Sequence, residues 1–273
     1  MKLAGVIGSP IAHSKSSLIF NTIFSRLGMS TFYLSIELKP MELDPFVRAS
    51  ADTFTGYNVT SPHKVSIMKH LDFIVPEASE IGSVNLVKIE EGKTTGYNVD
   101  IAGIAAAFAN SNIDFNAKDI LIAGSGGIFR TVAYYIFRNS VPASVYVMVR
   151  DTERAKNDLA DYIFSGSINL VSRNDAGKRK YDILINCTPL GTYPDTTGMP
   201  FPETLLGSAS VGIDMVYNPP ITGFLGAMSN NGAKIVTGRD LFIYQAIESM
   251  KILFGISVKK DEILGIIAGL SER

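Results

Sequence analysis

Residues 119–130 read DILIAGSGGIFR. The apolar run Ile120–Ala123 predicts a buried strand, and the spacing of apolar residues over Ile128–Arg138 predicts a helix, with a glycine-rich turn between them. Another apolar run, Ser144–Val149, predicts the next strand. Strands that alternate with helices form parallel sheets, so this stretch indicates a β-α-β unit of a doubly wound, Rossmann-like fold.

The glycine-rich turn has features of a dinucleotide-binding turn. Gly124 and Gly126 occupy the first two glycine positions of that fingerprint and Gly127 follows, whereas Phe129 stands at the third position. Glycines allow the backbone to approach a pyrophosphate, and a helix N-terminus offers unpaired N–H groups and a partial positive charge. The turn is therefore a candidate pyrophosphate site. The alternative is an ordinary connection between a strand and a helix.

The end of the following strand bears on the choice of cofactor. Where NAD-binding folds carry an acidic residue for the ribose, residues 147–155 read VMVRDTERA. Arg150 and Arg154 can form paired hydrogen bonds to a 2′-phosphate, which favours NADP. Asp151 keeps NAD open, because its carboxylate would repel a phosphate or accept hydrogen bonds from an unphosphorylated ribose. The bland alternative is a solvated start of the helix predicted over Glu153–Ile163.

The rest of the chain shows the same alternation of strands and helices. Short apolar runs that extend the parallel sheet are Asp182–Asn186, Val211–Met215 and Lys234–Val236. The first hundred residues predict a second α/β unit, with a helix at Ser16–Leu27 and strands at Leu3–Gly8, Phe32–Leu38, Tyr57–Val59, Val84–Ile89 and Gly96–Val99. Further helices are predicted over Ile101–Ala109, Leu241–Phe254 and Glu262–Leu270. We therefore expect an α/β protein with domains 1–101 and 102–238, and with residues 239–273 returning to the first domain.

Composition excludes several classes of protein. The chain has 273 residues, 46% of them apolar, and a formal net charge of −1, so no overall basic field favours nucleic acid or an anionic membrane. Cys187 is the only cysteine, which excludes an intrachain disulfide and a cysteine-rich metal site. No apolar run reaches the roughly 18 residues of a spanning helix, and the stretch after Lys2 is too short and too polar for a secretory signal. We expect a cytoplasmic protein.

Polar clusters follow three predicted strands in the first hundred residues, at the strand ends where open α/β sheets bind ligands. Ser14 and Ser16 suit a small polyol or carboxylate, although serines at a helix start are more often caps. Thr60 and Lys64 follow the next strand, and a lysine there is usually a surface residue. If Lys64 faces Asp100 in a cleft, the two form a lysine acid/base oriented by a carboxylate, and the chemistry is proton transfer.

Taken in order, the motifs of this chain resemble those of the shikimate dehydrogenase family from about Gly5 to about Ala246. The matching segments are SPIAHSKS (9–16), NVTSPHK (58–64), GSVN (82–85), GYNVD (96–100), GSGG (124–127), NCTPLG (186–191), DMVYNP (214–219) and YQA (244–246). Eight ordered matches are far more specific than one glycine motif. The resemblance implies a substrate-binding catalytic domain, a Rossmann domain and carboxy-terminal helices that return to the first domain.

The resemblance also implies roles for individual residues. Lys64 and Asp100 are the implied catalytic pair. The implied substrate contacts are Ser14, Ser16, Thr60, Asn85, Tyr217 and Gln245. The implied cofactor contacts are Gly124, Ser125, Gly126, Gly127, Arg150, Arg154 and Gly238. The implied reaction is the reversible NADPH-dependent reduction of 3-dehydroshikimate to shikimate, which serves chorismate and aromatic amino-acid synthesis and needs no metal.

Departures from the family pattern keep two other readings open. The family usually has small residues at the positions of Ile128 and Phe129, and Asn-Arg-Thr where this chain has Val149, Arg150 and Asp151. Because these changes surround the cofactor, one alternative is a shikimate/quinate dehydrogenase that uses NAD. The other is a non-catalytic NADP or metabolite sensor, against which the retained lysine and aspartate speak. The partner expected in each case is a small molecule, and the protein is expected to be a monomer or a homodimer.

Overall fold

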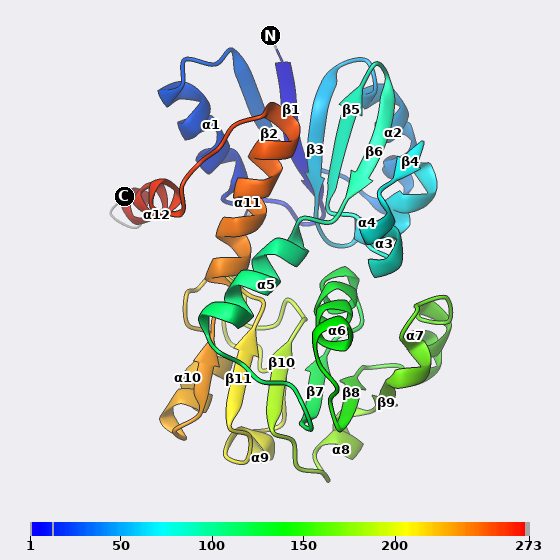
Figure 1. Cartoon of the computed structure of the whole chain (residues 1–273), viewed down its shortest axis with the longest axis vertical. Helices are drawn as coiled ribbons and strands as arrows, with labels where there is room; N and C mark the ends of the chain where they lie inside the picture. The colour runs from blue at the N-terminus through cyan, green and yellow to red at the C-terminus, as the bar shows by residue number, and fades with distance from the viewer. Residues whose placement is uncertain (1, 13, 271–273) are drawn as a thin grey trace. The chain divides into compact units, whose positions relative to one another are not determined.

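The computed structural model describes residues 2–12 and 14–270. The chain divides into two compact units, one formed by Met1–Asp100 with Ile243–Arg273 and the other by Ile101–Phe242 (Figure 1). Each unit is built around a six-stranded sheet. The predicted α/β class is confirmed. Among the helices of the described residues, none is long and apolar enough to cross a bilayer.

The sheet of the first unit is mixed and has the strand order β2-β1-β3-β5-β6-β4. Its strands are β1 (Lys2–Gly8), β2 (Thr31–Glu37), β3 (Phe54–Val59), β4 (Phe73–Ile74), β5 (Leu86–Glu90) and β6 (Lys93–Tyr97). Strands β1, β2 and β3 run parallel, as their connecting helices require, whereas β5 pairs antiparallel with both β3 and β6. The turn at Glu91-Gly92 joins β5 to β6, and both residues have positive φ values, 51° and 74°.

The helices of the first unit cover both faces of this sheet. They are α1 (Ser16–Arg26), α2 (Leu43–Ser50), α3 (His63–Ser66), α4 (Pro76–Ile81), the part of α11 (Arg239–Phe254) from Ile243 onward, and α12 (Lys260–Leu270). One core cluster contains Leu43, Val47 and Tyr57. Helix α11 is joined to β3 by a buried hydrogen bond of 2.8 Å from Asn58 Nδ2 to Ser249 Oγ. The carboxy-terminal helices are thus an integral part of the first unit.

The sheet of the second unit is entirely parallel and has the order β12-β11-β10-β7-β8-β9. Its strands are β7 (Asp119–Ala123), β8 (Ser144–Met148), β9 (Asn169–Val171), β10 (Ile183–Asn186), β11 (Val211–Asp214) and β12 (Lys234–Val236). The order reverses between β7 and β10, which is the switch point of a doubly wound fold, where such sheets bind dinucleotides. The predicted Rossmann-like sheet is confirmed.

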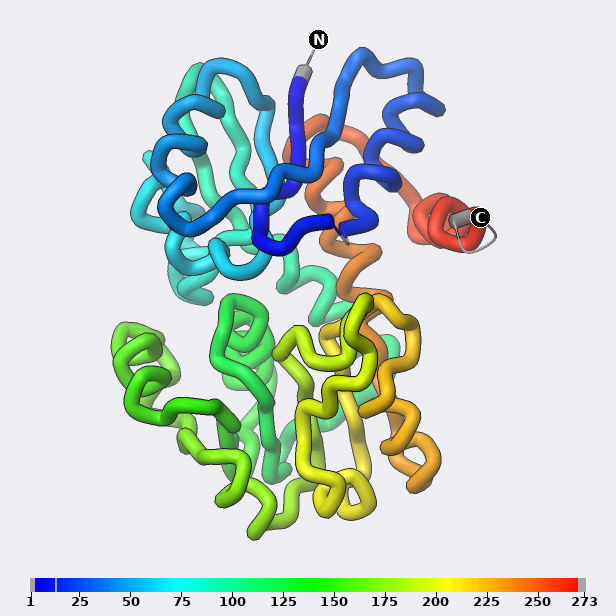
Figure 2. Tube along the Cα trace, turned by 180° about the vertical axis from the view of Figure 1, so that it is seen from behind, coloured from blue at the N-terminus to red at the C-terminus, as the bar shows by residue number. Residues whose placement is uncertain are grey.

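Helices cover both faces of this parallel sheet. They are α5 (Asp100–Asn110), α6 (Gly127–Asn139), α7 (Thr152–Asp158), α8 (Arg173–Ala176), α9 (Glu203–Leu206) and α10 (Gly223–Asn230). Successive residues of β7 point to opposite faces of the sheet and pack in two different cores. Ile120 and Ile122 pack with residues of α5 and α6, and Leu121 packs with residues of α9 and α10. Figure 1 shows α5 and α6 in front of the sheet, and Figure 2 shows the yellow and orange segments with α9 and α10 from behind.

One predicted helix is shorter than expected. The prediction ran from Glu153 to Ile163, but α7 ends at Asp158. Leu159 and Tyr162 are nevertheless buried, because backbone turns rather than a helix direct them into the core. The Tyr162 hydroxyl donates a 2.7 Å hydrogen bond to the backbone oxygen of Arg130, which fixes this turn against α6. Tertiary contacts have therefore overridden the helical spacing of the apolar residues.

Candidate active site

Lys64 and Asp100 form a close ion pair in the first unit, with Lys64 Nζ 2.6 Å from Asp100 Oδ2. Lys64 lies in α3, shortly after β3, and Asp100 follows β6. Because β5 is antiparallel to both of these strands, β3 and β6 point the same way and end at the same edge of the sheet. The side chains retain only 17% and 7% exposure, respectively. The structure therefore brings together the two residues that sequence analysis paired.

Two loops hold this pair by backbone and amide hydrogen bonds. The Asp100 N–H donates to Asn98 Oδ1 over 3.1 Å, and Asn98 Nδ2 donates to the Ser83 carbonyl over 2.9 Å. The Lys64 carbonyl accepts a 2.8 Å hydrogen bond from the Val84 N–H. Both partners are thus anchored to the segment around residues 83–85. A lysine held in this way by a carboxylate can donate or accept a proton at a fixed position.

The serines and threonine predicted for substrate binding follow the ends of β1 and β3, which are neighbouring parallel strands. Ser16 begins α1 and is 9% exposed, and its N–H donates to Ser14 Oγ over 3.3 Å. The N-cap position of α1 is Lys15, and no side-chain cap is found there among the described residues, so the capping alternative is not confirmed. The methyl group of Thr60 packs against Gly8. A Cβ at position 8 would lie only 2.4 Å from this methyl carbon, so position 8 requires a glycine. His13 of the same segment lies outside the described residues.

Asn85 and Gln245 also belong to the first unit. Asn85 is 3% exposed, and its Oδ1 accepts a 2.7 Å hydrogen bond from the Val99 N–H, next to Asp100. Within residues 2–12 and 14–270, its Nδ2 has no hydrogen-bond partner, which leaves two donors for another group. Gln245 lies on α11, where its backbone oxygen accepts from Ser249 Oγ over 2.7 Å. That serine also accepts from Asn58, which places this turn of α11 beside β3.

The glycine-rich turn between β7 and α6 has the geometry of a pyrophosphate cradle. Gly124 has a φ of +93°, and a Cβ there would lie 2.9 Å from Thr188 Cγ2. Gly126 precedes α6, where a Cβ would meet nothing within 4 Å, and no side chain caps the helix. The N–H groups of the first turn, which begins at Gly127, are thus free of a side-chain cap. Phe129 departs from the fingerprint because its fully buried ring fills the core beneath α6.

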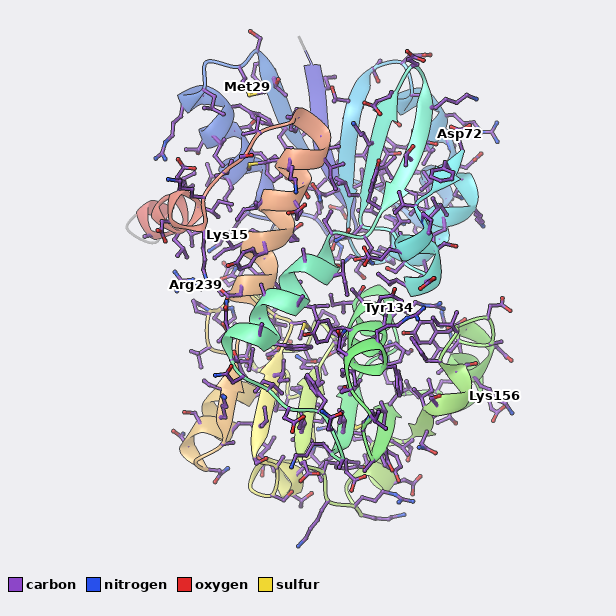
Figure 3. All side chains as sticks on the ribbon, in the orientation of Figure 1. Lys15, Met29, Asp72, Tyr134, Lys156 and Arg239 are labelled. Atoms are coloured by element: carbon purple, nitrogen blue, oxygen red, sulfur yellow. The ribbon has the colours of Figure 1, made fainter. Side chains whose placement is uncertain are left out.

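A pocket of about 540 Å³ lies beside this turn, at the end of β8. It is lined by Ser125, Val149, Arg150, Asp151, Arg154, Ala155 and Asp158. Asp151 caps α7, since its Oδ1 accepts a 2.9 Å hydrogen bond from the Arg154 N–H. Lys156, labelled in Figure 3, is an exposed residue of α7 outside the pocket lining. Two arginines in one pocket can hold a phosphate group.

The sequence analysis gave no role to Arg130 or Asp158, although both support this pocket. Arg154 Nε lies 3.5 Å from Asp158 Oδ2, so this carboxylate competes for an arginine of the pocket. Arg130 is 8% exposed, and it donates a 2.6 Å hydrogen bond to the Asp158 backbone oxygen. Its guanidinium also lies over the Tyr162 ring, 5.3 Å from the centroid. An arginine at the end of GSGGIFR was the available signal for this tether.

Tyr217 and Gly238, both in the second unit, follow β11 and β12. The Tyr217 ring stacks on Phe242, with centroids 4.0 Å apart and planes 8° apart. A Cβ on Gly238 would lie 2.6 Å from the backbone oxygens of Met215 and Val216, so only glycine allows this approach. Each residue therefore has a packing reason for its identity. Neither reason speaks against a ligand contact.

A buried carboxylate lies at the ends of β10 and β11. Asp214 accepts hydrogen bonds from Thr222 Oγ1 at 2.6 Å, Asn186 Nδ2 at 2.9 Å and the Val216 N–H at 2.9 Å. Burial raises the pKa of Asp214 to about 6, although these hydrogen bonds act in the opposite direction. The network fixes the loops that follow both strands. Both motifs are recognisable in the sequence, but their spacing does not indicate this network.

Comparison with known proteins finds shikimate dehydrogenases by sequence and by structure. Residues 6–87 match the family model described as the shikimate dehydrogenase substrate binding domain. A curated protein from Thermoplasma acidophilum, named shikimate dehydrogenase (NADP(+)), is 39% identical over 254 residues, which cover 93% of this chain and 91% of the relative.

Solved structures agree with these sequence matches. Shikimate dehydrogenase 1 from Peptoclostridium difficile has a TM-score of 0.87 and 30% identity, covering 99% of this chain and 98% of that one. Shikimate 5-dehydrogenase from Thermus thermophilus, solved in complex with NADP(H) and shikimate, has a TM-score of 0.81 and 26% identity, covering 98% of this chain and 99% of that one.

Proposed function

The chain belongs to the shikimate dehydrogenase family, and from this premise we propose that it interconverts 3-dehydroshikimate and shikimate with NADP. It is thus an oxidoreductase that acts on a CH–OH group and serves aromatic biosynthesis. The observation that carries the proposal is the pair of Lys64 and Asp100, 2.6 Å apart and mostly buried at one edge of the first sheet. A dehydrogenase of this kind needs such a group to move the hydroxyl proton.

The residues of the second unit fit the chemistry of NADP. We propose that the backbone of the turn holds the pyrophosphate through Gly124, Ser125, Gly126 and Gly127. We also propose that Arg150 and Arg154 hold the 2′-phosphate. Gly238 is proposed to lie beside the same cofactor. When bound, NADP supplies or accepts the hydride.

The proton step belongs to Lys64. In the reducing direction negative charge develops on the ketone oxygen, and the Lys64 ammonium stabilises and protonates it; in the oxidising direction Nζ accepts the hydroxyl proton. Asp100 holds Nζ in place through the 2.6 Å contact. Because the pair is mostly buried, its interaction is less screened by water than a surface ion pair.

The polar residues of the first unit suit a carboxylated polyol. We propose that Ser14 and Ser16 bind the substrate carboxylate and that Thr60, Asn85 and Gln245 bind ring hydroxyls, with Tyr217 as a further substrate contact. The unsatisfied donors of Asn85 support this assignment most directly. A hydroxyl oxygen of the substrate can accept from its Nδ2.

The proposal extends to the organisation of the protein. Residues 1–101 with 239–273 are proposed as the substrate-binding catalytic domain and residues 102–238 as the NADP domain. A chain with a single cysteine fits the reducing cytoplasmic location that we propose. The expected state is a monomer or a homodimer.

A second candidate, an NAD-using shikimate/quinate dehydrogenase, is favoured by one observation: two carboxylates, Asp151 and Asp158, line the pocket beside the two arginines. Four parallel reactions that cross shikimate and quinate with NADP and NAD decide between them. We expect turnover of shikimate with NADP. Preference for quinate or NAD would instead support the second candidate. Bound cofactor without turnover would support a sensor.

A further inference from the structure

His63 is a fully buried histidine next to Lys64 for which the proposed mechanism has no use. Its Nε2 lies 2.8 Å from the backbone oxygen of Leu38. A carbonyl oxygen only accepts hydrogen bonds, so Nε2 carries the ring proton and Nδ1 is a bare acceptor. Nδ1 is buried and has no hydrogen-bond partner among residues 2–12 and 14–270.

The bare Nδ1 makes histidine a costly choice for packing alone. A buried acceptor without a partner loses its hydrogen bonds to water and gains none in return. An apolar side chain of similar size would fill the same volume without this cost. What histidine provides here, and an apolar side chain cannot, is the hydrogen bond from Nε2 to the Leu38 oxygen.

Leu38 is a rigid point of attachment. It follows β2 directly, and its N–H donates a 3.0 Å hydrogen bond to the Gly8 oxygen, which continues the pairing of β1 with β2 by one residue. The His63 side chain thus ties α3 to the end of two paired strands. Leu38 cannot shift without breaking its hydrogen bond to Gly8 at the end of the sheet.

Helix α3 has four residues and continues directly into a 3-10 helix over Ile67–His70, and so short a helical segment depends on contacts with the rest of the protein. Apart from the ion pair of Lys64 and the 3.0 Å bond from the His63 N–H to the Thr60 oxygen just before the helix, two hydrogen bonds join α3 to segments distant in sequence within the described part of the chain. One runs from the Val84 N–H to the Lys64 oxygen over 2.8 Å, and the other is that of the His63 ring. Without the second tie, α3 would lose its link to the end of β2.

We propose that His63 is a positioning residue for Lys64: its hydrogen bond to Leu38 fixes α3 so that Nζ rests beside Asp100. This inference rests on the proposed function, since it concerns the proton-transferring group of that reaction. It assigns no contact between His63 and the substrate. The effect on turnover comes entirely through the placement of the lysine.

Two amide variants test the tie. In His63→Gln the amide nitrogen reaches about as far as Nε2 and can still donate to Leu38, whereas the shorter His63→Asn cannot reach that oxygen. We expect His63→Asn to lower kcat for shikimate oxidation at least about tenfold, with KM for shikimate and NADP within about twofold of wild type. His63→Gln should keep kcat within about threefold of wild type.

A control separates positioning from a general loss of stability. Ile89 is 6% exposed in β5 and belongs to the core cluster that contains Leu43 and Tyr57. Ile89→Ala should therefore lower Tm without lowering kcat. If His63→Asn does not fold, as judged by circular dichroism, His63→Met takes its place, because methionine fills the ring volume and cannot donate. The same loss of kcat is expected for it.

The outcomes distinguish this inference from the proposed function. Absence of shikimate turnover in the wild-type protein would overturn the function itself. With an active wild type, the inference alone is overturned by normal kcat in the non-donating variant, by equal losses in His63→Gln and that variant, or by an equal loss in Ile89→Ala. A loss of kcat restored by glutamine supports it.

Discussion

Asp151 shows how the structure adds a backbone role to a residue that the sequence left open between a cofactor contact and a helix start. As a sequence feature its carboxylate either repels a 2′-phosphate or binds a ribose. In the structure Oδ1 instead accepts the Arg154 N–H at 2.9 Å and begins α7. Its charge therefore lies at the positive end of a short helix, which reduces its effect on a neighbouring phosphate.

Replacing Asp151 tests this capping role. Asp151→Ala removes the cap and should lower the free energy of unfolding by about 1 kcal/mol, whereas Asp151→Ser keeps a capping oxygen and should cost little. Urea unfolding of the two variants and the wild type measures the difference. Equal stability of the alanine and serine variants would show that the side chain does not stabilise α7.

Arg150 is the residue whose replacement most directly reports on the 2′-phosphate. Arg150→Ala should weaken NADPH binding about tenfold or more and leave NADH binding nearly unchanged, because only the first ligand carries the phosphate. The fluorescence of the bound reduced nicotinamide, which absorbs at longer wavelength than the protein's aromatic side chains, measures both affinities. Lys156→Ala is the matched control, since Lys156 is an exposed cation of α7, the helix that follows Arg150, and lies outside the pocket lining.

Equal losses of NADPH and NADH binding in Arg150→Ala would contradict the assignment. An equally large loss of NADPH preference in Lys156→Ala would also contradict it, because the effect would then reflect the general positive charge around α7.

At the scale of elements, the ends of strands β10 and β11 are organised by a charge that the sequence did not predict. NCTPLG and DMVYNP were recognisable as motifs, but nothing in their spacing showed that Asn186, Asp214 and Thr222 share hydrogen bonds. The strands themselves were predictable, because apolar runs between glycines and prolines mark buried parallel strands. Side-chain networks depend on register, which the sequence does not reveal.

The Asp214 carboxyl predicts a dependence of stability on pH. Its pKa is raised from 3.8 to about 6 in the folded protein, so the native state takes up a proton as pH falls through 6 while the unfolded chain remains ionised. This contribution to stability is complete below the unfolded pKa and is lost as pH rises through 6. Relative to Asp214→Asn, the wild type should gain about 1–3 kcal/mol between pH 7.5 and pH 4.5.

Urea unfolding of both proteins at the two pH values gives this difference directly. The asparagine variant removes the titrating group while keeping the side-chain shape, so groups common to both proteins cancel. A difference in unfolding free energy that is the same at both pH values would contradict a raised pKa at this site.

An edge strand illustrates another feature beyond the reach of pattern. β2 is the last strand of its sheet, yet the Asn21 side chain of α1 bonds both the N–H and the oxygen of Tyr33, at 2.8 and 2.9 Å. These bonds occupy backbone groups that an outside strand would otherwise pair with. The sequence predicted both elements but gave no sign of this contact between them.

At the scale of the whole molecule, the two α/β units and most of their strands followed from the periodicity of apolar residues. The pairing of Lys64 with Asp100 was implied by the family resemblance, and their positions after two strands made it possible, because the topology brings both strand ends to one edge. Contacts that span the chain were not predictable, and the bond between Asn58 and Ser249, 191 residues apart, is the plainest case. Such contacts depend on tertiary geometry rather than on local preference.

The most direct test of the account is the rate of shikimate oxidation by Lys64→Ala, measured alongside binding of shikimate and NADP. We expect kcat to fall about 10²–10⁴-fold because the proton-accepting group is lost, with both dissociation constants within about threefold of wild type. Lys69→Ala, a change at an exposed lysine five positions further along, should retain full activity. Turnover of Lys64→Ala at the wild-type rate would contradict the central claim that Lys64 moves the proton.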